Sequence, residues 1–227
     1  MATVTQPGLF RSHLPAHWTL ADLQEHLGGI PLARIRLVPP PGYATEEDVS
    51  AIEAREDRLC ELVDGVLVEK PIGWYESILA GLILTKLNVY LETHDLGQAL
   101  GADGCLKLLR GVVKIPDVCF ISWKRFPEKK LPRRPIPALV PDLVVEVLSE
   151  SNTVEEMREK LSMYFEAGVR LVWYVDPATR SAKSYSGPTS FTEVGANGVL
   201  DGADVLPGLE ISLRELFEKA DRQRPRG

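Results

Sequence analysis

The residue type most suggestive of chemistry is a glutamate within an apolar strand. Glu146 lies in the apolar stretch 143–148, between Val145 and Val147. Burying even a neutral polar group without a partner costs roughly 2–7 kcal/mol, so a carboxylate here needs a metal, a cation or a hydrogen-bond donor. The alternatives are an internal salt bridge and a strand end that reaches solvent. The position predicts either a structural ion pair or a cation-binding site.

A second carboxylate can join Glu146 only if it lies on a neighbouring strand. Asp142 is four residues away on the same strand, about 13 Å at roughly 3.3 Å per residue. Oxygen ligands of Mg²⁺ lie about 2.1 Å from the ion, so these two cannot share it. Asp117 follows Pro116 at the start of another apolar stretch, and adjacent strands are about 4.8 Å apart. Taken alone, Pro-Asp is more typical of a tight turn, but as a partner for Glu146 Asp117 is the better candidate.

Two more charged residues could complete such a site. Lys160 lies beside the apolar stripe of a predicted helix, so it could reach over the end of the sheet toward Glu146. Extension into solvent is the usual alternative for such a lysine. Glu61, at the start of a hairpin, is by spacing alone an edge-strand carboxylate. Glu69 and Glu76 are expected at the solvated surface.

The elements that must position these residues form an α/β pattern. Asp64-Gly65 joins two apolar runs within 61–69, a strong hairpin signal. Helical spacing spans 75–93, with Gly97 as a stop, and a helix capped by Thr153 runs to about 167. The apolar stretches 143–148 and 171–175 are typical of strands covered on both faces. We therefore expect a mixed central sheet flanked by helices, with a terminal helix near 213–219.

The sequence divides into three segments. Residues 1–44 are predicted to form a short N-terminal extension, with a helix capped by Thr19 and an edge strand over 30–38. Residues 45–220 form the main domain, and 221–227 a basic tail.

Composition narrows the function classes. The 227 residues carry a net charge of −6, which argues against a protein that coats nucleic acid through bulk charge. The three cysteines form no CxxC pair, and no apolar run is long enough for a membrane span. These features predict a soluble, cytoplasmic protein without membrane contact.

One loop runs against the acidic balance and could contact nucleic acid. Trp123 and Phe126 in this loop could stack on bases. Its alternative role is that of a solubilising loop. The basic residues of this loop are Lys124, Arg125, Lys129, Lys130, Arg133 and Arg134.

Several of these stretches together resemble the Uma-type restriction endonuclease family of the PD-(D/E)XK nuclease superfamily. The resemblance covers roughly 45–216 and rests on the stretches 61–69, 115–118, 141–149 and 171–177, together with Lys160, Tyr164 and 167–169. It implies a restriction-endonuclease-like core. Asp117 and Glu146 then match the two acids of the superfamily motif. The usual motif lysine is replaced by Leu148, and its role moves to Lys160.

The resemblance also implies an activity, a cofactor and partners. Asp117, Glu146 and Glu61 would hold Mg²⁺ or Mn²⁺, and Lys160 would act beside them in hydrolysing DNA phosphodiester bonds. Many members of the superfamily act as dimers, so a homodimer is expected. A histidine common early in the long helix is missing here. The alternative is therefore a catalytically silent module that binds nucleic acid or another partner, and a small-phosphoester hydrolase is a third possibility.

Overall fold

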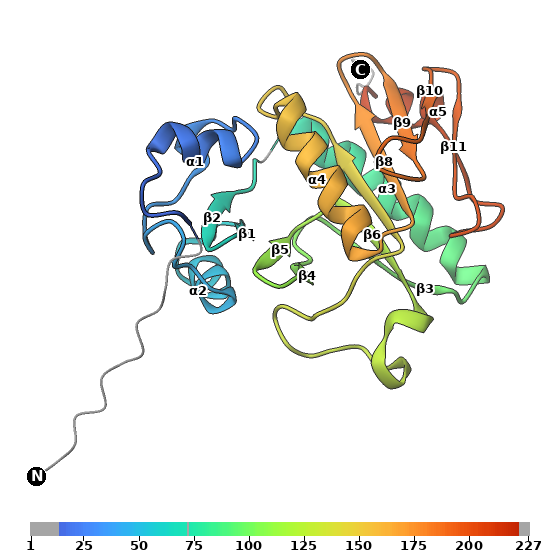
Figure 1. Cartoon of the computed structure of the whole chain (residues 1–227). Coiled ribbons are helices and arrows are strands. Elements are labelled where there is room, and N and C mark those ends of the chain that lie inside the picture. Colours follow the sequence, from blue (N-terminus) through green and yellow to red (C-terminus); the bar gives the residue numbers. More distant parts are fainter. Residues whose placement is uncertain (1–13, 72, 223–227) are drawn as a thin grey trace, which may run out of the picture.

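A computed structural model of the chain describes residues 14–71 and 73–222 (Figure 1). Its centre is a six-stranded sheet in the order β10-β9-β8-β7-β6-β3. Strands β7 and β8 are parallel and the other neighbours antiparallel, which confirms the predicted mixed sheet. The strands are β3 (Gly97–Leu100), β6 (Val118–Ser122), β7 (Leu143–Val147), β8 (Leu171–Asp176), β9 (Ser181–Tyr185) and β10 (Phe191–Val194).

Helices cover both faces of this sheet. Helices α3 (Trp74–Thr93) and α5 (Leu213–Ala220) pack on one face, in the apolar cluster that contains Val145 and Trp173. Helix α4 (Val154–Ala167) packs on the other face, against Val144 and Val172. Successive strand residues point to opposite faces, so β7 is apolar throughout because both faces are buried. Helix α3 ends before Gly97, which begins β3 and is not the predicted helix stop.

Helix α4 is the crossover between the two parallel strands. The Thr153 hydroxyl accepts a hydrogen bond from the backbone N–H of Glu156 at 2.9 Å, which caps the start of the helix. Gly168 ends it in the left-handed conformation, with φ +98°. This connection brings the carboxyl end of β7 close to the beginning of α4.

A second, four-stranded sheet has the order β2-β1-β5-β4. Its hairpin turns at Asp64 and Gly65, both with positive φ, as predicted for an Asp-Gly turn. Helix α2 (Glu46–Glu56) packs on it through Val49 and Ile52. The strands are β1 (Cys60–Val63), β2 (Val66–Glu69), β4 (Leu106–Leu109) and β5 (Val112–Lys114), while β11 (Val199–Asp201) and β12 (Glu210–Ser212) pair separately before α5.

The N-terminal extension contains the predicted capped helix but not the predicted strand. Helix α1 (Leu20–His26) begins with a Thr19–Asp22 capping box. In place of a strand over 30–38, a 3₁₀ helix η1 (Leu32–Arg34) is followed by a single bridge between Ile35 and Val68. The prediction was wrong because Arg34 turns inward, 8% exposed, and binds Glu156 of α4. Of the predicted basic tail, 221–227, residues 223–227 lie outside the described residues.

The three cysteines are buried and free. Burial raises the pKa of Cys60 and Cys105 to about 11 and that of Cys119 to about 12. They therefore remain protonated at neutral pH. Within the described residues, no helix is both long and apolar enough to cross a bilayer.

Candidate active site

The two acids expected to share a cation lie on neighbouring strands. Strands β6 and β7 are antiparallel with Val118 opposite Val145, so the same register continued by one residue sets Asp117 beside Glu146. The backbone N–H of Val147 donates to Oδ2 of Asp117 at 2.8 Å. The strand pairing on which this partnership depended is thus confirmed. Asp117 and Glu146 both line a cavity of about 220 Å³.

Lys160 reaches this cavity from α4. Its ammonium lies 3.6 Å from Oε1 of Glu146 and 3.3 Å from Oε1 of Glu61, and its side chain is 5% exposed. Extension into solvent is therefore excluded. Burial alone would lower the pKa of Lys160, but Glu146 and Glu61 hold it above its usual value. A permanently charged ammonium lies at the cavity wall.

Glu61 lies on the other side of Lys160. Its Oε2 is 3.0 Å from the ammonium of Lys114, and its Oε1 accepts from the backbone N–H of Ile115 at 3.3 Å. Burial opposes ionisation, but Lys114 and Lys160 hold the pKa of Glu61 well below its usual range. Both oxygens are already engaged, and Glu61 lines a separate cavity of about 30 Å³. The geometry makes Glu61 a counter-charge that positions Lys160.

Glu146 is held in a different way. The hydroxyl of Tyr164 donates to its Oε1. Burial raises the pKa of Glu146, and the nearby Asp117 raises it further, although Lys160 opposes both effects. Burial and the charge of Glu146 raise the pKa of Tyr164, so its hydroxyl stays protonated and donates. Among the described residues, no protein group donates a hydrogen bond to Oε2 of Glu146.

Sequence reasoning missed Lys70 and the position of Glu76. The Lys70 ammonium is 3.0 Å from Oδ1 of Asp117 and donates to the carbonyl of Ile115 at 2.7 Å. Both Lys70 and Glu76 line the 220 Å³ cavity. The hairpin register could have located Lys70. It pairs Cys60 with Glu69 and continues to Leu59 and Lys70, which sets Lys70 close to Glu61 on the neighbouring strand.

The residues of this cavity fit a divalent cation bound by oxygen. Mg²⁺ commonly takes one or two carboxylates and completes its shell with water and substrate phosphate. Asp117 and Glu146 supply such a pair, and each carboxylate oxygen has lone pairs beyond those in its present contacts. Glu61 does not fit as a third ligand because it lines the separate 30 Å³ cavity, whereas Asp117 and Glu146 line the 220 Å³ cavity. Within the described residues, no group of three or more His, Cys, Asp or Glu side chains could hold a metal.

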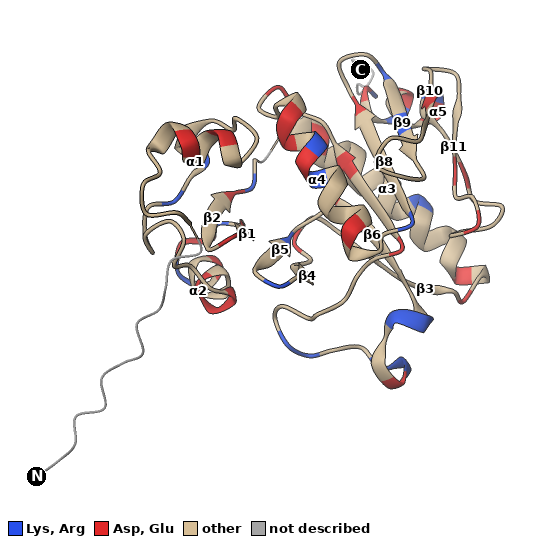
Figure 2. Ribbon diagram, in the orientation of Figure 1, with Lys and Arg blue, Asp and Glu red and all other residues tan. Residues whose placement is uncertain are grey.

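The basic loop lies at the other end of the sheet (Figure 2). Arg125 is bound to Oδ1 of Asp142 at 3.2 Å and to the carbonyl of Gly168 at 2.7 Å, at the start of β7 and the end of α4. Phe126 is 5% exposed and packs in the core, so the expectation that it stacks on bases was wrong. Trp123 packs against Phe126, and its indole N–H donates to Asp95.

Comparison with known proteins identifies the family. A family model described as "Putative restriction endonuclease", Uma2, matches residues 46–214. The chain belongs to the Uma2 family. Arg34 and the rest of the N-terminal extension precede the matched residues of this Uma2 chain.

A solved structure supports the fold of the Uma2 chain. It is described as a putative nuclease belonging to DUF820 from Anabaena variabilis ATCC 29413. The TM-score is 0.64 at 16% identity, over 72% of this chain and 92% of that one. The likeness shows a nuclease fold. A search of curated proteins finds no match.

Proposed function

We propose that this Uma2 protein is a metal-dependent endonuclease of PD-(D/E)XK type that hydrolyses phosphodiester bonds of DNA. The observation that carries the proposal is the meeting of Asp117, Glu146 and Lys160 at one cavity. Asp117 and Glu146 are the proposed ligands of Mg²⁺ or Mn²⁺. When bound, the ion would lower the pKa of a bound water and offset charge on the phosphate.

The protein's own residues divide the remaining tasks. The ammonium of Lys160 is proposed to orient the attacking water or to stabilise charge on a phosphate oxygen. Oε1 of Glu61 lies 3.3 Å from the Lys160 ammonium and is proposed to position it, while the Tyr164 hydroxyl is proposed to orient the Glu146 carboxylate. Lys70 and the backbone N–H of Val147 fix Asp117. A homodimer, as expected for the superfamily, would offer two such cavities to two strands.

A plasmid-nicking assay in Mg²⁺ or Mn²⁺ tests this function. We expect the wild type to nick DNA and Glu146→Gln to be inactive while remaining folded. Asp142→Asn, on the same strand but away from the cavity, is the matched control and is expected to cleave. Wild-type protein that cleaves no nucleic acid would contradict the proposal and favour a silent binding module. Cleavage of a small phosphoester in place of DNA would contradict the assigned substrate.

A further inference from the structure

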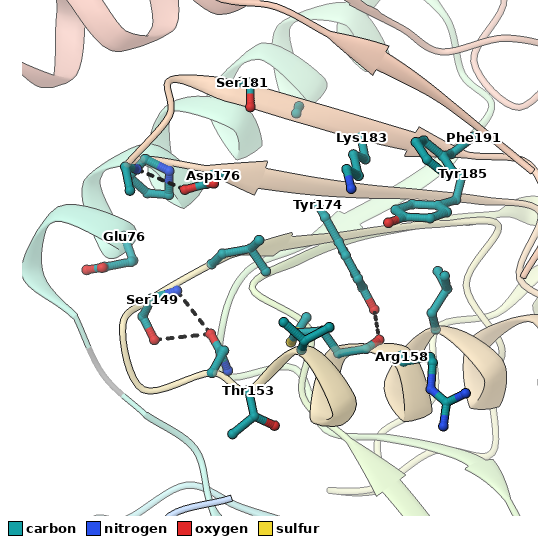
Figure 3. Close-up of a pocket in the computed structure, with 18 of the residues that line it drawn as sticks. Glu76, Ser149, Thr153, Arg158, Tyr174, Asp176, Ser181, Lys183, Tyr185 and Phe191 are labelled. Carbon is teal, nitrogen blue, oxygen red and sulfur yellow. Dashed lines mark hydrogen bonds between the residues drawn. The ribbon is translucent and has the colours of Figure 1, made fainter. Parts of the chain in front are cut away.

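A groove of about 760 Å³ lies beside the candidate active site (Figure 3). It lies between α4 and the strands β8, β9 and β10, on the part of the sheet that α4 leaves uncovered. The groove and the 220 Å³ cavity share Glu76, Ser149 and Asn152 as lining residues. A ligand lying in the groove would therefore reach the edge of the proposed metal site.

Charges are distributed unequally along this groove. Glu76 and Asp176 lie at the end next to Ser149, whereas Arg158 and Lys183 lie toward the other end (Figure 3). Arg158 contacts Glu155 and, at 3.7 Å, Glu159; Lys183 lies 4.0 Å from Glu193. Exposed ion pairs of this kind contribute little free energy, so both cations can turn to an anionic ligand. The end far from the metal site thus suits phosphate groups.

Aromatic side chains line the same basic end. The Tyr185 ring centroid lies 5.2 Å from that of Tyr174, at an interplanar angle of 64°, and 5.2 Å from that of Phe191, at 43°. Tyr174 is fixed because its hydroxyl donates to the carbonyl of Met157 at 2.7 Å, and the Lys183 ammonium lies 5.0 Å from the Phe191 ring centroid. Phe191 is 47% exposed. Partly exposed aromatic rings beside cations are typical of surfaces on which bases of single-stranded nucleic acid stack.

We propose that this groove binds an unpaired segment of DNA, with bases stacked on Tyr185 and Phe191 and phosphates near Arg158 and Lys183. The strand would then run past Ser149 toward Asp117 and Glu146. Ser181 and Tyr185 are separated by about 13 Å along β9, at roughly 3.3 Å per residue, enough for more than one base. Bases in a duplex are already stacked on their neighbours, so this groove favours single strands over duplexes. The inference rests on the proposed nuclease function and adds a substrate class.

Fluorescence anisotropy with a labelled single-stranded oligonucleotide and its duplex, in EDTA, tests the groove. We expect the wild type to bind the single strand more tightly than the duplex. The variant Tyr185→Ala/Phe191→Ala should weaken single-strand binding about fivefold or more, since one stacking contact is worth about 5- to 150-fold. Tyr185→Phe should preserve binding. The control Lys86→Ala/Arg214→Ala, on α3 and α5 at the opposite face of the sheet, should match the wild type.

Three outcomes would overturn the groove assignment. These are equal affinity of the wild type and Tyr185→Ala/Phe191→Ala, tighter binding of the duplex, and a variant that changes only self-association in sedimentation. The last would indicate a second copy in the groove. If the double variant is unfolded by circular dichroism, the single change Phe191→Ala at the exposed position applies the same criteria.

The two proposals can fail separately. Single-strand binding that depends on Tyr185 and Phe191, without cleavage by the wild type, would refute the nuclease and leave the groove. Cleavage abolished by Glu146→Gln, with unaltered binding by the aromatic variant, would refute the groove and leave the nuclease. Glu146→Gln itself should bind the single strand as the wild type does.

Discussion

The two ends of β7 each bear a buried carboxylate, and Glu146, near one of them, lines a cavity. At the start of the strand, Oδ2 of Asp142 accepts from the backbone N–H of Ser122 at 2.9 Å, and Oδ1 binds Arg125. Near its other end, Glu146 lies 3.6 Å from the Lys160 ammonium and lines the cavity that Asp117 also lines. A buried acid in an apolar strand is thus either a structural anchor or a candidate ligand. The difference lies in whether the protein satisfies both oxygens.

The largest contrast between the two ends is expected in activity. Replacing Glu146 with Gln removes the charge that the proposed ion needs, so we expect cleavage to fall by about 10²–10³-fold or more. The rate of plasmid nicking in Mn²⁺ measures the loss, and a thermal melt shows whether the fold is kept. Nicking at the wild-type rate would remove Glu146 from the site.

Lys160 should matter for stability as well as activity. Lys160→Met leaves Glu61 and Glu146 buried with one cation fewer, and breaking such a pair costs about 3–5 kcal/mol. We expect a decrease near the lower value, about 3 kcal/mol, because Glu146 can take up a proton. Urea unfolding measures it, with exposed Lys129→Met as the control near zero. A decrease in unfolding free energy no larger than that of the control would mean that the contacts of Lys160 with Glu61 and Glu146 do not stabilise the fold.

Arg34 of the N-terminal extension should stabilise the fold to an extent that depends on pH. Arg34 holds Glu156 through two hydrogen bonds of 2.8 and 3.1 Å. Burial opposes ionisation of Glu156, yet Arg34 lowers its pKa. A lowered carboxyl pKa stabilises the fold above the unfolded value, about 4.3, and this contribution disappears as pH falls below it.

Arg34→Met tests this sign directly. We expect the unfolding free energy to fall by about 3 kcal/mol at pH 7, as for other broken buried pairs. The decrease should be smaller near pH 4, because Glu156 without Arg34 can be protonated there. Urea unfolding of variant and wild type at both pH values measures the difference. Equal losses at the two pH values would assign the effect to packing alone.

A change at Asp142, at the start of β7, should have the smallest effect on stability and should not reduce cleavage. Asp142→Asn weakens the contact with Arg125, and hydrogen bonds to charged groups contribute about 1.5–3 kcal/mol. We expect unfolding free energy to fall by about that amount, with nicking within about twofold of wild type after correction for folded fraction. A large loss of activity in folded protein would erase the distinction between the two ends.

Much of this site follows from local sequence. Local signals predict the elements that carry the site residues. The Asp64-Gly65 hairpin carries Glu61, the first of two apolar strands carries Glu146, and the capped helix between those strands carries Lys160. Parallel neighbouring strands need a crossover connection, so the helix between them packs on a face of the sheet. The partnership of Asp117 with Glu146 needed only one assumption, the pairing of β6 with β7, which is confirmed.

The rest depended on contacts distant in sequence. Arg34 and Glu156 are separated by 122 positions, and no local pattern indicates that an alternating stretch will bend to make that contact. Phe126 is buried although its loop is rich in charge, because the 3₁₀ turn η2 (Trp123–Arg125) directs it into the core. We propose Glu61 as a counter-charge to Lys160 in place of a ligand because it lines a cavity separate from that of Asp117 and Glu146.

The most direct test of the central claim is Mn²⁺ binding by isothermal titration calorimetry, without nucleic acid. We predict that the wild type and Asp142→Asn bind Mn²⁺ alike, and that Glu146→Gln and Asp117→Asn bind it at least about tenfold more weakly, since each loses a charged ligand. Absence of binding by folded wild type, or equal binding by Glu146→Gln, would contradict the assignment of a metal site to this end of β7.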